Sequence, residues 1–193
     1  MVHLYPPRGR GNCDDTKRDA VIWCIPEDSL PQGGFSIEGG LDASGLRFAV
    51  VVARFNAHVT GNLYDGCHEE LIGRGAEASS VRSVEVPGCF ELPLVAKELA
   101  AGGGFDAVIC LGAIIRGDTP HFDYVSAETA AGIRQAGFDT GVPVIFGVLT
   151  TDNEEQAMAR VGGAAGHKGR EAALAAIEMA HTMKGLRAER SAQ

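Results

Sequence analysis

An alternation of short apolar runs with longer amphipathic segments, starting at residue 46, constrains the fold more than any other feature of this chain. The apolar runs are rich in Val, Ile and Ala, as expected for strands buried on both faces. They predict strands at 46–53, 81–86, 107–111 and 144–149. Strands that alternate with helices form a parallel sheet covered on both faces, with right-handed crossovers. The sequence therefore predicts an α/β fold, a three-layer α/β/α sandwich around a flavodoxin-like four-stranded parallel sheet.

Helix caps and glycine breaks place helices between these strands, at about 56–73, 90–102, 123–136, 151–161 and 168–183. Asn56 is expected to cap the first helix, because an Asn side chain accepts hydrogen bonds from the N–H groups of a first turn. Thr151 and Glu154 have the spacing of a capping box, which predicts the short fourth helix. Gly162 and Gly163 then separate this helix from the last one.

The ends of the chain differ in composition from the region between them. Residues 1–35 are rich in Pro, Gly and mixed charge, and we predict that they form an irregular or mobile N-terminal arm. Residues 36–186 are predicted to form one domain, with 187–193 as a C-terminal tail. Within that domain, residues 36–38 are expected to add a short N-terminal strand.

Charge, cysteine content and hydropathy argue against several classes of function. The net charge is -8 and no block of Lys and Arg occurs, which disfavours nucleic-acid binding. Five cysteines without a CxxC pair disfavour a disulfide framework or a zinc knuckle and favour a reducing compartment. No apolar run is long enough to cross a membrane, and the stretch at 21–25 is too short for a signal peptide. We therefore expect a cytoplasmic protein.

Unusual residues gather directly after each predicted strand. In open α/β sheets, ligands bind beyond the carboxyl ends of the strands, so these residues are expected to meet at one edge of the sheet. The stretches concerned are Arg54–Asn56, Val86–Pro93, Gly112–Tyr124 and Thr150–Asn153.

Two side chains at this edge suit a flat ligand that carries hydroxyl groups. Phe55 can stack its ring on a heterocycle, although an isolated aromatic after a strand is also a common core residue. Glu91 can accept hydrogen bonds from a polyol, although the helix dipole alone also favours a carboxylate at a helix start. Cys89 is expected to be a small packing residue rather than a nucleophile, because no base lies next to it in the sequence.

His121 is the best candidate for acid–base chemistry. It follows the third strand in a polar loop, and histidine has an ordinary pKa close to neutrality. A surface histidine without a function is the alternative. Asp123 either orients His121 or caps the helix that follows. A metal site built on these two residues has too few ligands, so none is expected.

Two further stretches suit an anion. The loop Gly117–Thr119 can hold a phosphate through backbone N–H groups and the Thr119 hydroxyl, whereas the negative charge of Asp118 opposes one. Arg160 and Lys168 flank the glycine break. Lys168 at a helix start opposes the helix dipole, which indicates an anionic ligand, and solvated helix ends are the alternative.

Taken in order, these stretches resemble the sequence blocks of the lumazine synthase family. Val86–Pro93 is similar to the ribityl-binding turn of that family, and Gly112–Val125 to its signature loop. Its other blocks are resembled by Arg54–Asn56, Pro143–Thr151 and His167–Ala173. The resemblance spans about residues 36–186 and is more specific than any one short motif.

The resemblance implies a site, residue by residue. It assigns the uracil to Phe55, to the backbone of Ala113, Ile114 and Ile115, and to Phe146 of a neighbouring subunit. It assigns the ribityl chain to Cys89, Phe90 and Glu91. It assigns the phosphate end to Asp118, Thr119, Lys168 and the Arg160 of the neighbour. His121 is implied as the proton donor and acceptor.

The implied reaction condenses 5-amino-6-(D-ribitylamino)uracil with 3,4-dihydroxy-2-butanone 4-phosphate to 6,7-dimethyl-8-ribityllumazine, the penultimate step of riboflavin biosynthesis. An amine attacks the ketone, water leaves, phosphate is eliminated, and a second amine closes the ring. One histidine suits these proton movements, and most of the rate is expected from holding two substrates together. The resemblance thus implies a transferase that uses no cofactor and no metal.

The resemblance also implies an assembly. Family members form homo-pentamers, and the short break at 162–166 is similar to that of members whose pentamers close into an icosahedral 60-mer. We expect such a shell, with riboflavin synthase as the candidate partner protein. Two departures from the family pattern are Cys89, where Ala or Ser is commoner and oxidation is a new sensitivity, and the long arm before Ser36.

Two alternatives stay open at the level of sequence. One is a flavin- or nucleotide-binding module without catalysis, which the fold alone permits. The other is a shell-forming carrier protein that has lost its activity. A pure binder does not need His121 together with Arg160 and Lys168, and this favours the enzyme.

Overall fold

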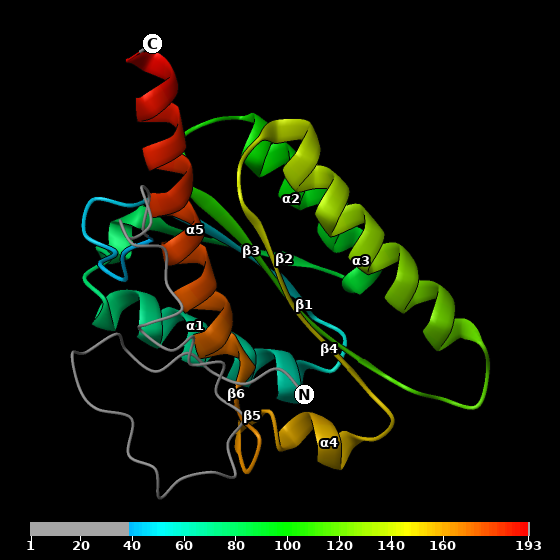
Figure 1. The fold of residues 1–193 in the computed structure, drawn as a ribbon. Coiled ribbons are helices and arrows are strands. Elements are labelled where there is room, and N and C mark those ends of the chain that lie inside the picture. Colours follow the sequence, from blue (N-terminus) through cyan, green and yellow to red (C-terminus); the bar gives the residue numbers. More distant parts are fainter. Residues whose placement is uncertain (1–38, 193) are drawn as a thin grey trace, which may run out of the picture. The chain divides into compact units, whose positions relative to one another are not determined.

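The four apolar runs form four parallel strands in the computed structural model, which describes residues 39–192. The strands are β1 (Phe48–Ala53), β2 (Val81–Val86), β3 (Ala107–Ile115) and β4 (Val144–Thr151). Their order in the sheet is β2-β1-β3-β4 (Figure 1). The predicted flavodoxin-like four-stranded parallel sheet is therefore confirmed. The arm at 1–35 and the strand expected at 36–38 lie outside the described residues.

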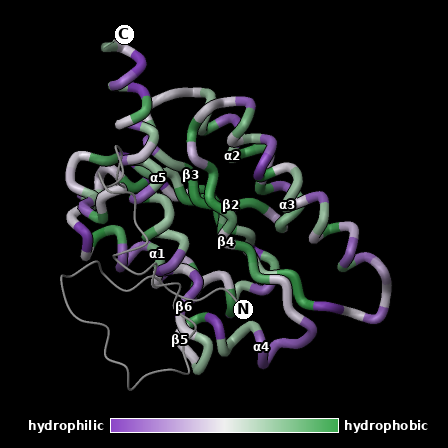
Figure 2. The backbone as a smooth tube through the Cα atoms, in the orientation of Figure 1, coloured by the Kyte–Doolittle hydropathy of each residue, from purple (hydrophilic) through white to green (hydrophobic). Residues whose placement is uncertain are grey.

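Two long helices cover each face of the sheet, which confirms the three-layer arrangement (Figure 1). On one face, α1 (Ala57–Gly73) and α5 (Lys168–Ser191) pack against strand residues such as Phe48 and Ile109. On the other face, α2 (Leu92–Ala101) and α3 (His121–Thr140) pack against Val51 and Cys110. The strands between the helices are the most hydrophobic part of the trace in Figure 2, as expected for strands buried on both faces.

Small residues allow α5 to lie close to the sheet. The buried face of α5 consists mostly of small residues at helical spacing, with Ile177 as the one large side chain; the small residues are Gly169, Ala172, Ala173, Ala176 and Ala180. Gly147 of β4 faces this helix. A Cβ at Gly147 would lie 2.6 Å from Leu111 Cδ2 and 3.2 Å from the Ala172 Cβ, so the close approach requires glycine there.

Short elements complete the domain. The 3-10 helix η2 (Ala78–Ser80) precedes β2, and η3 (Cys89–Glu91) follows it. After β4 comes α4 (Glu154–Met158), and the glycine break is a hairpin of two antiparallel strands, β5 (Val161–Gly163) and β6 (Gly166–His167). This hairpin leads directly into α5.

Some predicted element ends were wrong. β3 continues to Ile115 rather than Leu111, because Gly112 is a buried strand residue and not the start of a loop. α3 begins at His121 instead of Asp123. α5 runs to Ser191, beyond the point where its apolar pattern stops, because the charged residues that follow are good helix formers.

The predicted capping box of α4 was also wrong. Asn153, not Thr151, is the N-cap residue, and its Oδ1 accepts a hydrogen bond from the Gln156 N–H at 2.9 Å. Thr151 is instead the last residue of β4, where it is buried. The strand runs past Leu149, so the cap falls two positions later than the spacing indicated.

Candidate active site

Phe55 and Asn56 connect β1 to α1 at the carboxyl edge of the sheet. The Phe55 ring is 71% exposed, which excludes the alternative of a core residue. Asn56 has φ 60° and ψ 46°, a left-handed conformation that Asn adopts more readily than most residues. Asn56 occupies the predicted N-cap position of α1, but its side chain caps no N–H group there: the Asn56 Nδ2 donates to the Ala113 carbonyl oxygen at 3.0 Å. This bond ties the loop that carries Phe55 to β3.

The turn after β2 presents Phe90 and Glu91 at the same edge. Phe90 is 60% exposed. Glu91 is exposed at the start of α2, yet its carboxylate caps no N–H group of that helix. A Cβ at Gly88 would lie 3.2 Å from Glu91 Oε2, so glycine at this position leaves the carboxylate room. The geometry thus keeps Glu91 available for hydrogen bonding to a ligand.

Cys89 packs beneath this turn with 5% of its surface exposed. Burial, opposed by a hydrogen bond from the Ala113 backbone, raises the pKa of its thiol to about 11. A thiol that stays buried and protonated reacts slowly, which argues against the sensitivity to oxidation expected from the sequence. The Cys89 Sγ occupies the space beside Gly112, where a Cβ would lie only 2.5 Å away.

The end of β3 supplies Ala113, Ile114 and Ile115 in regular strand conformation. All three pair with β4, whereas the pairing of β3 with β1 ends at Leu111. In the described part of the chain, one backbone edge of this strand end therefore has no strand beside it. Such an edge can hydrogen-bond the polar rim of a heterocycle, the role that the resemblance implies for these residues.

His121 is exposed and is the first residue of α3, so its predicted place within a loop was wrong. Pro120 occupies the N-cap position and ends the loop. Asp118 and Thr119 lie in the exposed turn just before it. The N-terminus of a 20-residue helix carries partial positive charge, which favours a phosphate near Thr119.

Arg116 forms a contact network that the sequence analysis missed. Its Nη1 lies 3.2 Å from Asp123 Oδ1, its Nε donates to Asp152 Oδ1 at 3.1 Å, and its guanidinium lies 4.0 Å from the centre of the Phe122 ring. Asp123 therefore contacts Arg116, and neither predicted role of Asp123 was right. No local pattern indicates the pair of Arg116 with Asp152, because the two residues are 36 positions apart.

A second group of predicted residues lies at the β5–β6 hairpin. The Arg160 carbonyl accepts a hydrogen bond from the Lys168 N–H at 2.8 Å, which holds the two residues together. The Arg160 Nη1 donates to the Gln156 carbonyl at 2.8 Å. Lys168 Nζ lies 2.6 Å from Glu171 Oε2, and both side chains are mostly buried. The hairpin thus holds two cations in defined positions.

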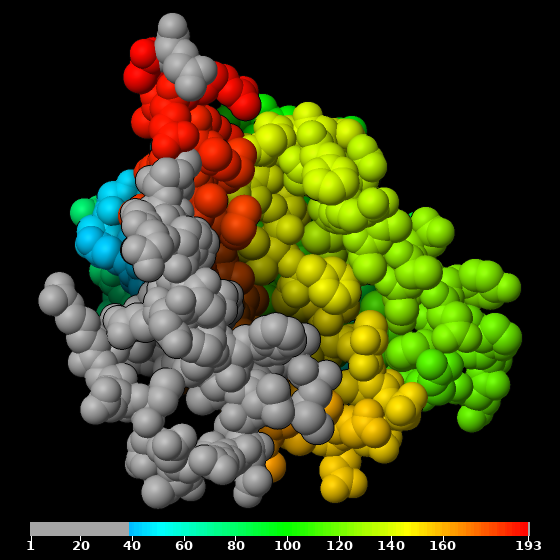
Figure 3. Space-filling model, in the orientation of Figure 1, coloured from blue at the N-terminus to red at the C-terminus, as the bar shows by residue number. Residues whose placement is uncertain are grey.

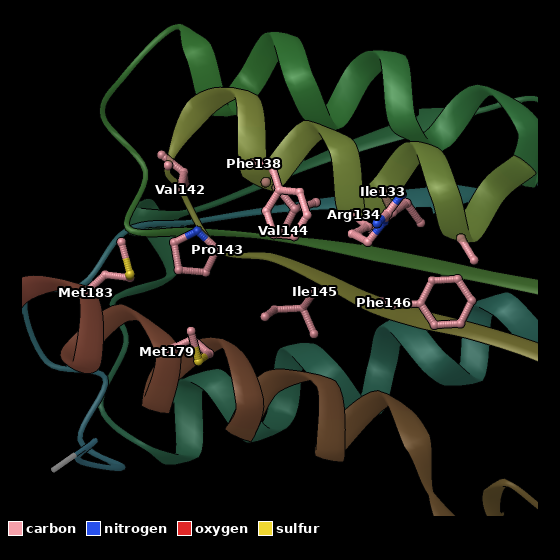
Figure 4. A pocket seen from close by; sticks show the side chains of 13 residues that line it. Ile133, Arg134, Phe138, Val142, Pro143, Val144, Ile145, Phe146, Met179 and Met183 are labelled. Atoms are coloured by element: carbon pink, nitrogen blue, oxygen red, sulfur yellow. The ribbon is translucent and has the colours of Figure 1, made fainter.

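Phe146 is not brought to the other predicted residues within one chain. It pairs with Cys110 in the middle of β3, whereas the strand pair ends at Ile115 and Thr151. Five residues of extended strand, from 146 to 151, separate Phe146 from the carboxyl edge by roughly 16 Å. Phe146 instead lies at one end of an apolar groove of about 530 Å³, which runs between α3, β4 and α5 (Figure 4).

Other chemistry finds little support in the part of the chain that the structure describes. The three cysteines there, Cys67, Cys89 and Cys110, are buried thiols. Burial raises the pKa of Cys67 to about 12 and also raises that of Cys110. Among residues 39–192, no group of three or more His, Cys, Asp or Glu side chains is arranged to hold a metal ion. No helix in that range is long and apolar enough to span a membrane.

Comparison with known proteins identifies the family. Residues 45–184 match the 6,7-dimethyl-8-ribityllumazine synthase family. The chain belongs to this family. It is 54% identical over 147 residues to the 6,7-dimethyl-8-ribityllumazine synthase of Syntrophus aciditrophicus, covering 76% of this chain and 96% of the relative. It is 53% identical over 150 residues to that of Desulfotalea psychrophila, covering 78% and 97%.

The family confirms three of the predictions made from sequence. The chain is a member of the lumazine synthase family, it is an enzyme of the transferase class, and its reaction is the riboflavin-pathway step that the resemblance implied. A non-catalytic binding module or carrier is not favoured. The individual roles of the site residues stay predictions.

Proposed function

We propose that this chain condenses 5-amino-6-(D-ribitylamino)uracil with 3,4-dihydroxy-2-butanone 4-phosphate in a site that two copies of the chain complete together. The observation that carries this proposal is the Phe55 ring, which is 71% exposed on a loop bonded to the end of β3. An exposed aromatic ring beside a strand end that has no neighbouring strand on one side suits a flat, polar heterocycle. The uracil is such a ligand.

The ribitylamino-uracil binds across the ends of β1, β2 and β3. Its ring stacks on Phe55, and its polar rim meets the backbone of Ala113, Ile114 and Ile115. The ribityl hydroxyl groups donate to Glu91 and reach the backbone of Cys89 and Phe90. The exposure of Glu91, with no capping duty toward α2, supports this assignment.

The keto-phosphate binds beside His121, with its phosphate at the turn of Asp118 and Thr119. The 5-amino group attacks the ketone carbon and water leaves. His121 then takes a proton from the carbon next to the imine and gives a proton to the departing phosphate oxygen. Phosphate loss leaves an enol, which tautomerises to a new ketone. The second amine attacks this carbonyl, and loss of a second water closes the ring.

The neighbouring copy supplies Phe146, Arg160 and Lys168. Arg160 binds the phosphate because a guanidinium matches phosphate geometry, and Lys168 adds charge nearby. Support for Phe146 from a second copy comes from the register of β4. That register keeps the ring roughly 16 Å from the carboxyl edge of its own sheet.

Two apolar surfaces at opposite edges of the sheet favour a ring of subunits over a two-fold dimer. Phe90 and Leu94, 60% and 68% exposed, follow edge strand β2. Phe138 and Phe146, 72% and 44% exposed, border the groove at the other edge strand, β4. Different surfaces join head to tail, and such contacts form a ring where the rotation between neighbouring subunits closes. We therefore propose a homo-pentamer that assembles further into an icosahedral 60-mer.

The location and the partner follow from the chemistry. Three buried thiols without disulfides suit a reducing compartment, and we propose the cytoplasm. The product is consumed by riboflavin synthase, which is the partner protein we propose.

A turnover assay tests the role of His121. The two substrates are mixed, and lumazine absorbance and fluorescence are followed for the wild type, His121→Ala and His68→Ala, a control on α1. His121→Ala should slow product formation roughly 100- to 10,000-fold without changing the assembly. The control should turn over like the wild type. Unchanged turnover of His121→Ala would remove His121 from the mechanism.

Mixed assemblies test whether two copies form one site. His121→Ala and Arg160→Ala chains are inactive or weak alone, and they are co-expressed in equal amounts. If each site takes His121 from one chain and Arg160 from the next, about a quarter of the sites are intact and turnover recovers to that level. If both residues serve the same chain, every site keeps a defect and co-expression restores nothing, which contradicts the shared site.

A further inference from the structure

The Arg116 side chain connects the two ends of the loop between β3 and α3. It is the first residue after β3, and its guanidinium reaches the first turn of α3. There it lies 3.2 Å from Asp123 Oδ1 and 4.0 Å from the centre of the Phe122 ring. The loop between these contacts, 117–120, is fully exposed. The Arg116 side chain thus spans a loop whose own residues are not buried against the rest of the domain.

Arg116 also anchors this loop to β4. Its Nε donates to Asp152 Oδ1 at 3.1 Å, and its backbone N–H donates to the Thr151 carbonyl at 2.9 Å. Asp152 is held in turn, because its N–H donates to Gln156 Oε1 at 3.1 Å. One side chain therefore connects the end of β3, the start of α3 and the loop after β4.

The charges around Arg116 favour a structural role for this side chain over a role in binding phosphate. Two carboxylates, Asp123 and Asp152, contact its one positive charge, and the Phe122 ring covers one face of the guanidinium. Arg116 and the two carboxylates together carry a net charge of −1, which repels a phosphate. Each contact is exposed, so each adds little to the stability of the fold. What the contacts do together is fix the relative positions of the segments that they join.

We propose that Arg116 is a positioning residue that holds His121 in the productive geometry for the condensation. His121 directly precedes Phe122 and Asp123, the two residues of α3 that Arg116 contacts. Holding these neighbours fixes the first turn of α3 and with it the His121 side chain. The proposal rests on the proposed proton-transfer role of His121.

Steady-state kinetics of Arg116→Met and Arg116→Lys test the proposal. Met keeps the unbranched stem, and Lys keeps the charge but loses the planar fork that spans two carboxylates. Both variants should lower kcat roughly 10- to 100-fold, as expected for a displaced catalytic group. KM for the ribitylamino-uracil should stay the same, because Phe55 and Glu91 lie on other loops. The matched control is Lys97→Met, which removes an equally exposed ion pair, to Asp139, between α2 and α3.

A double-mutant cycle separates positioning from other roles. In a His121→Ala background, Arg116→Met should cause no further loss of kcat, because the group that it positions is absent. An equal loss in both backgrounds overturns the proposal. So does a rescue by Arg116→Lys with only the KM of the keto-phosphate raised, which indicates direct phosphate binding. Unchanged turnover of His121→Ala alone instead refutes the proposed role of His121, and the single variant reports this separately.

Discussion

The carboxyl edge of the sheet and the apolar groove at β4 both expose aromatic rings, but they hold them in different surroundings. At the edge, Phe55 stands on a loop fixed by a hydrogen bond from Asn56, with open backbone and a carboxylate nearby. In the groove, Phe138 and Phe146 are surrounded by apolar side chains such as Ile145 and Met179 (Figure 4). The difference indicates a small polar ligand at the edge and another protein surface in the groove.

The groove lies on the face of the domain shown in Figure 3, where α3 and β4 stand beside α5. The buried residues of α3 are few, Thr129, Ile133 and Ala136, although the helix has 20 residues. A helix this long with so small a buried face needs a further surface against which to pack. The groove is therefore the surface at which we propose that a second copy binds.

The largest expected effect follows from placing a charge in the groove. Phe138→Glu introduces a carboxylate at a ring that is 72% exposed in the single chain, so the fold should survive. Arg134, whose guanidinium lies 5.6 Å from the centre of the Phe138 ring, is the only cation that lines the described groove, and desolvating the new carboxylate beside it between two copies should prevent their association. Turnover should then fall below detection, because we propose that two copies share the site. Sedimentation velocity, circular dichroism and the lumazine assay report the three properties. An assembled and active variant would show that the groove faces solvent.

A smaller effect is expected when the edge loses its ring. Phe55→Ala should raise KM for the ribitylamino-uracil roughly 10- to 100-fold, the range of stacking losses for bases on aromatic side chains. Assembly and thermal stability should not change, since the ring is largely exposed. Phe55→Tyr, which keeps the stacking surface, is the control. Loss of assembly in Phe55→Ala would contradict the distinction between a ligand-binding edge and a subunit-binding groove.

The edge was predictable from the sequence because parallel topology alone brings strand ends together. The stretches after the four strands therefore led to Phe55, Glu91 and His121 without knowledge of distances. Local details failed where one residue type serves two roles. Asn is a frequent helix cap but also tolerates the left-handed conformation, and Asn56 uses the second property.

The groove and the Arg116 network were not predictable, because their members lie far apart in the sequence. Phe138 belongs to α3 and Met179 to α5, and neither shows a local signal that it borders a groove. The contact of Arg116 with Asp152 depends on how two loops approach each other after the strands have paired. Periodicity reports which face of an element is apolar, but not which apolar faces the fold leaves uncovered.

A moderate effect on stability tests how rigidly the edge is built. Gly112→Ala places a methyl group 2.5 Å from the Cys89 Sγ and 3.3 Å from Leu92 Cδ1, which should lower the free energy of unfolding by about 1–3 kcal/mol. Replacing Cys89 by Ala in the same chain removes the nearer atom and should restore part of the loss. Urea unfolding at one fixed protein concentration measures both variants. Equal stability of Gly112→Ala and the wild type would show that the turn at η3 can shift to accommodate the added methyl group.

The smallest expected effect is a pH dependence of the folding stability. It arises from His167 at the β5–β6 hairpin and not from the groove. Burial, and next the charge of Arg170, lowers the folded-state pKa of His167, while Glu69 and Glu171 act in the opposite direction. The unfolded chain keeps the ordinary value near 6.5, so below that pH it binds a proton that the folded chain does not. Stability is therefore greatest above about pH 6.5 and falls as the pH drops toward the folded-state pKa.

Two substitutions isolate this contribution. His167→Gln removes the titrating group, so the difference between urea midpoints at pH 7.5 and pH 5.5 should shrink. Arg170→Gln removes the second cause of the shift and should shrink the difference less, because burial remains the larger cause. The hairpin of His167 carries Arg160 and Lys168, whereas the only ionisable group that lines the described groove is Arg134. In the proposed shared site this hairpin supplies Arg160 and Lys168 to the neighbouring copy, so turnover should fall over the pH range in which the hairpin weakens. Assembly through the groove should hold over that range, and its loss would show that the hairpin also holds the copies together.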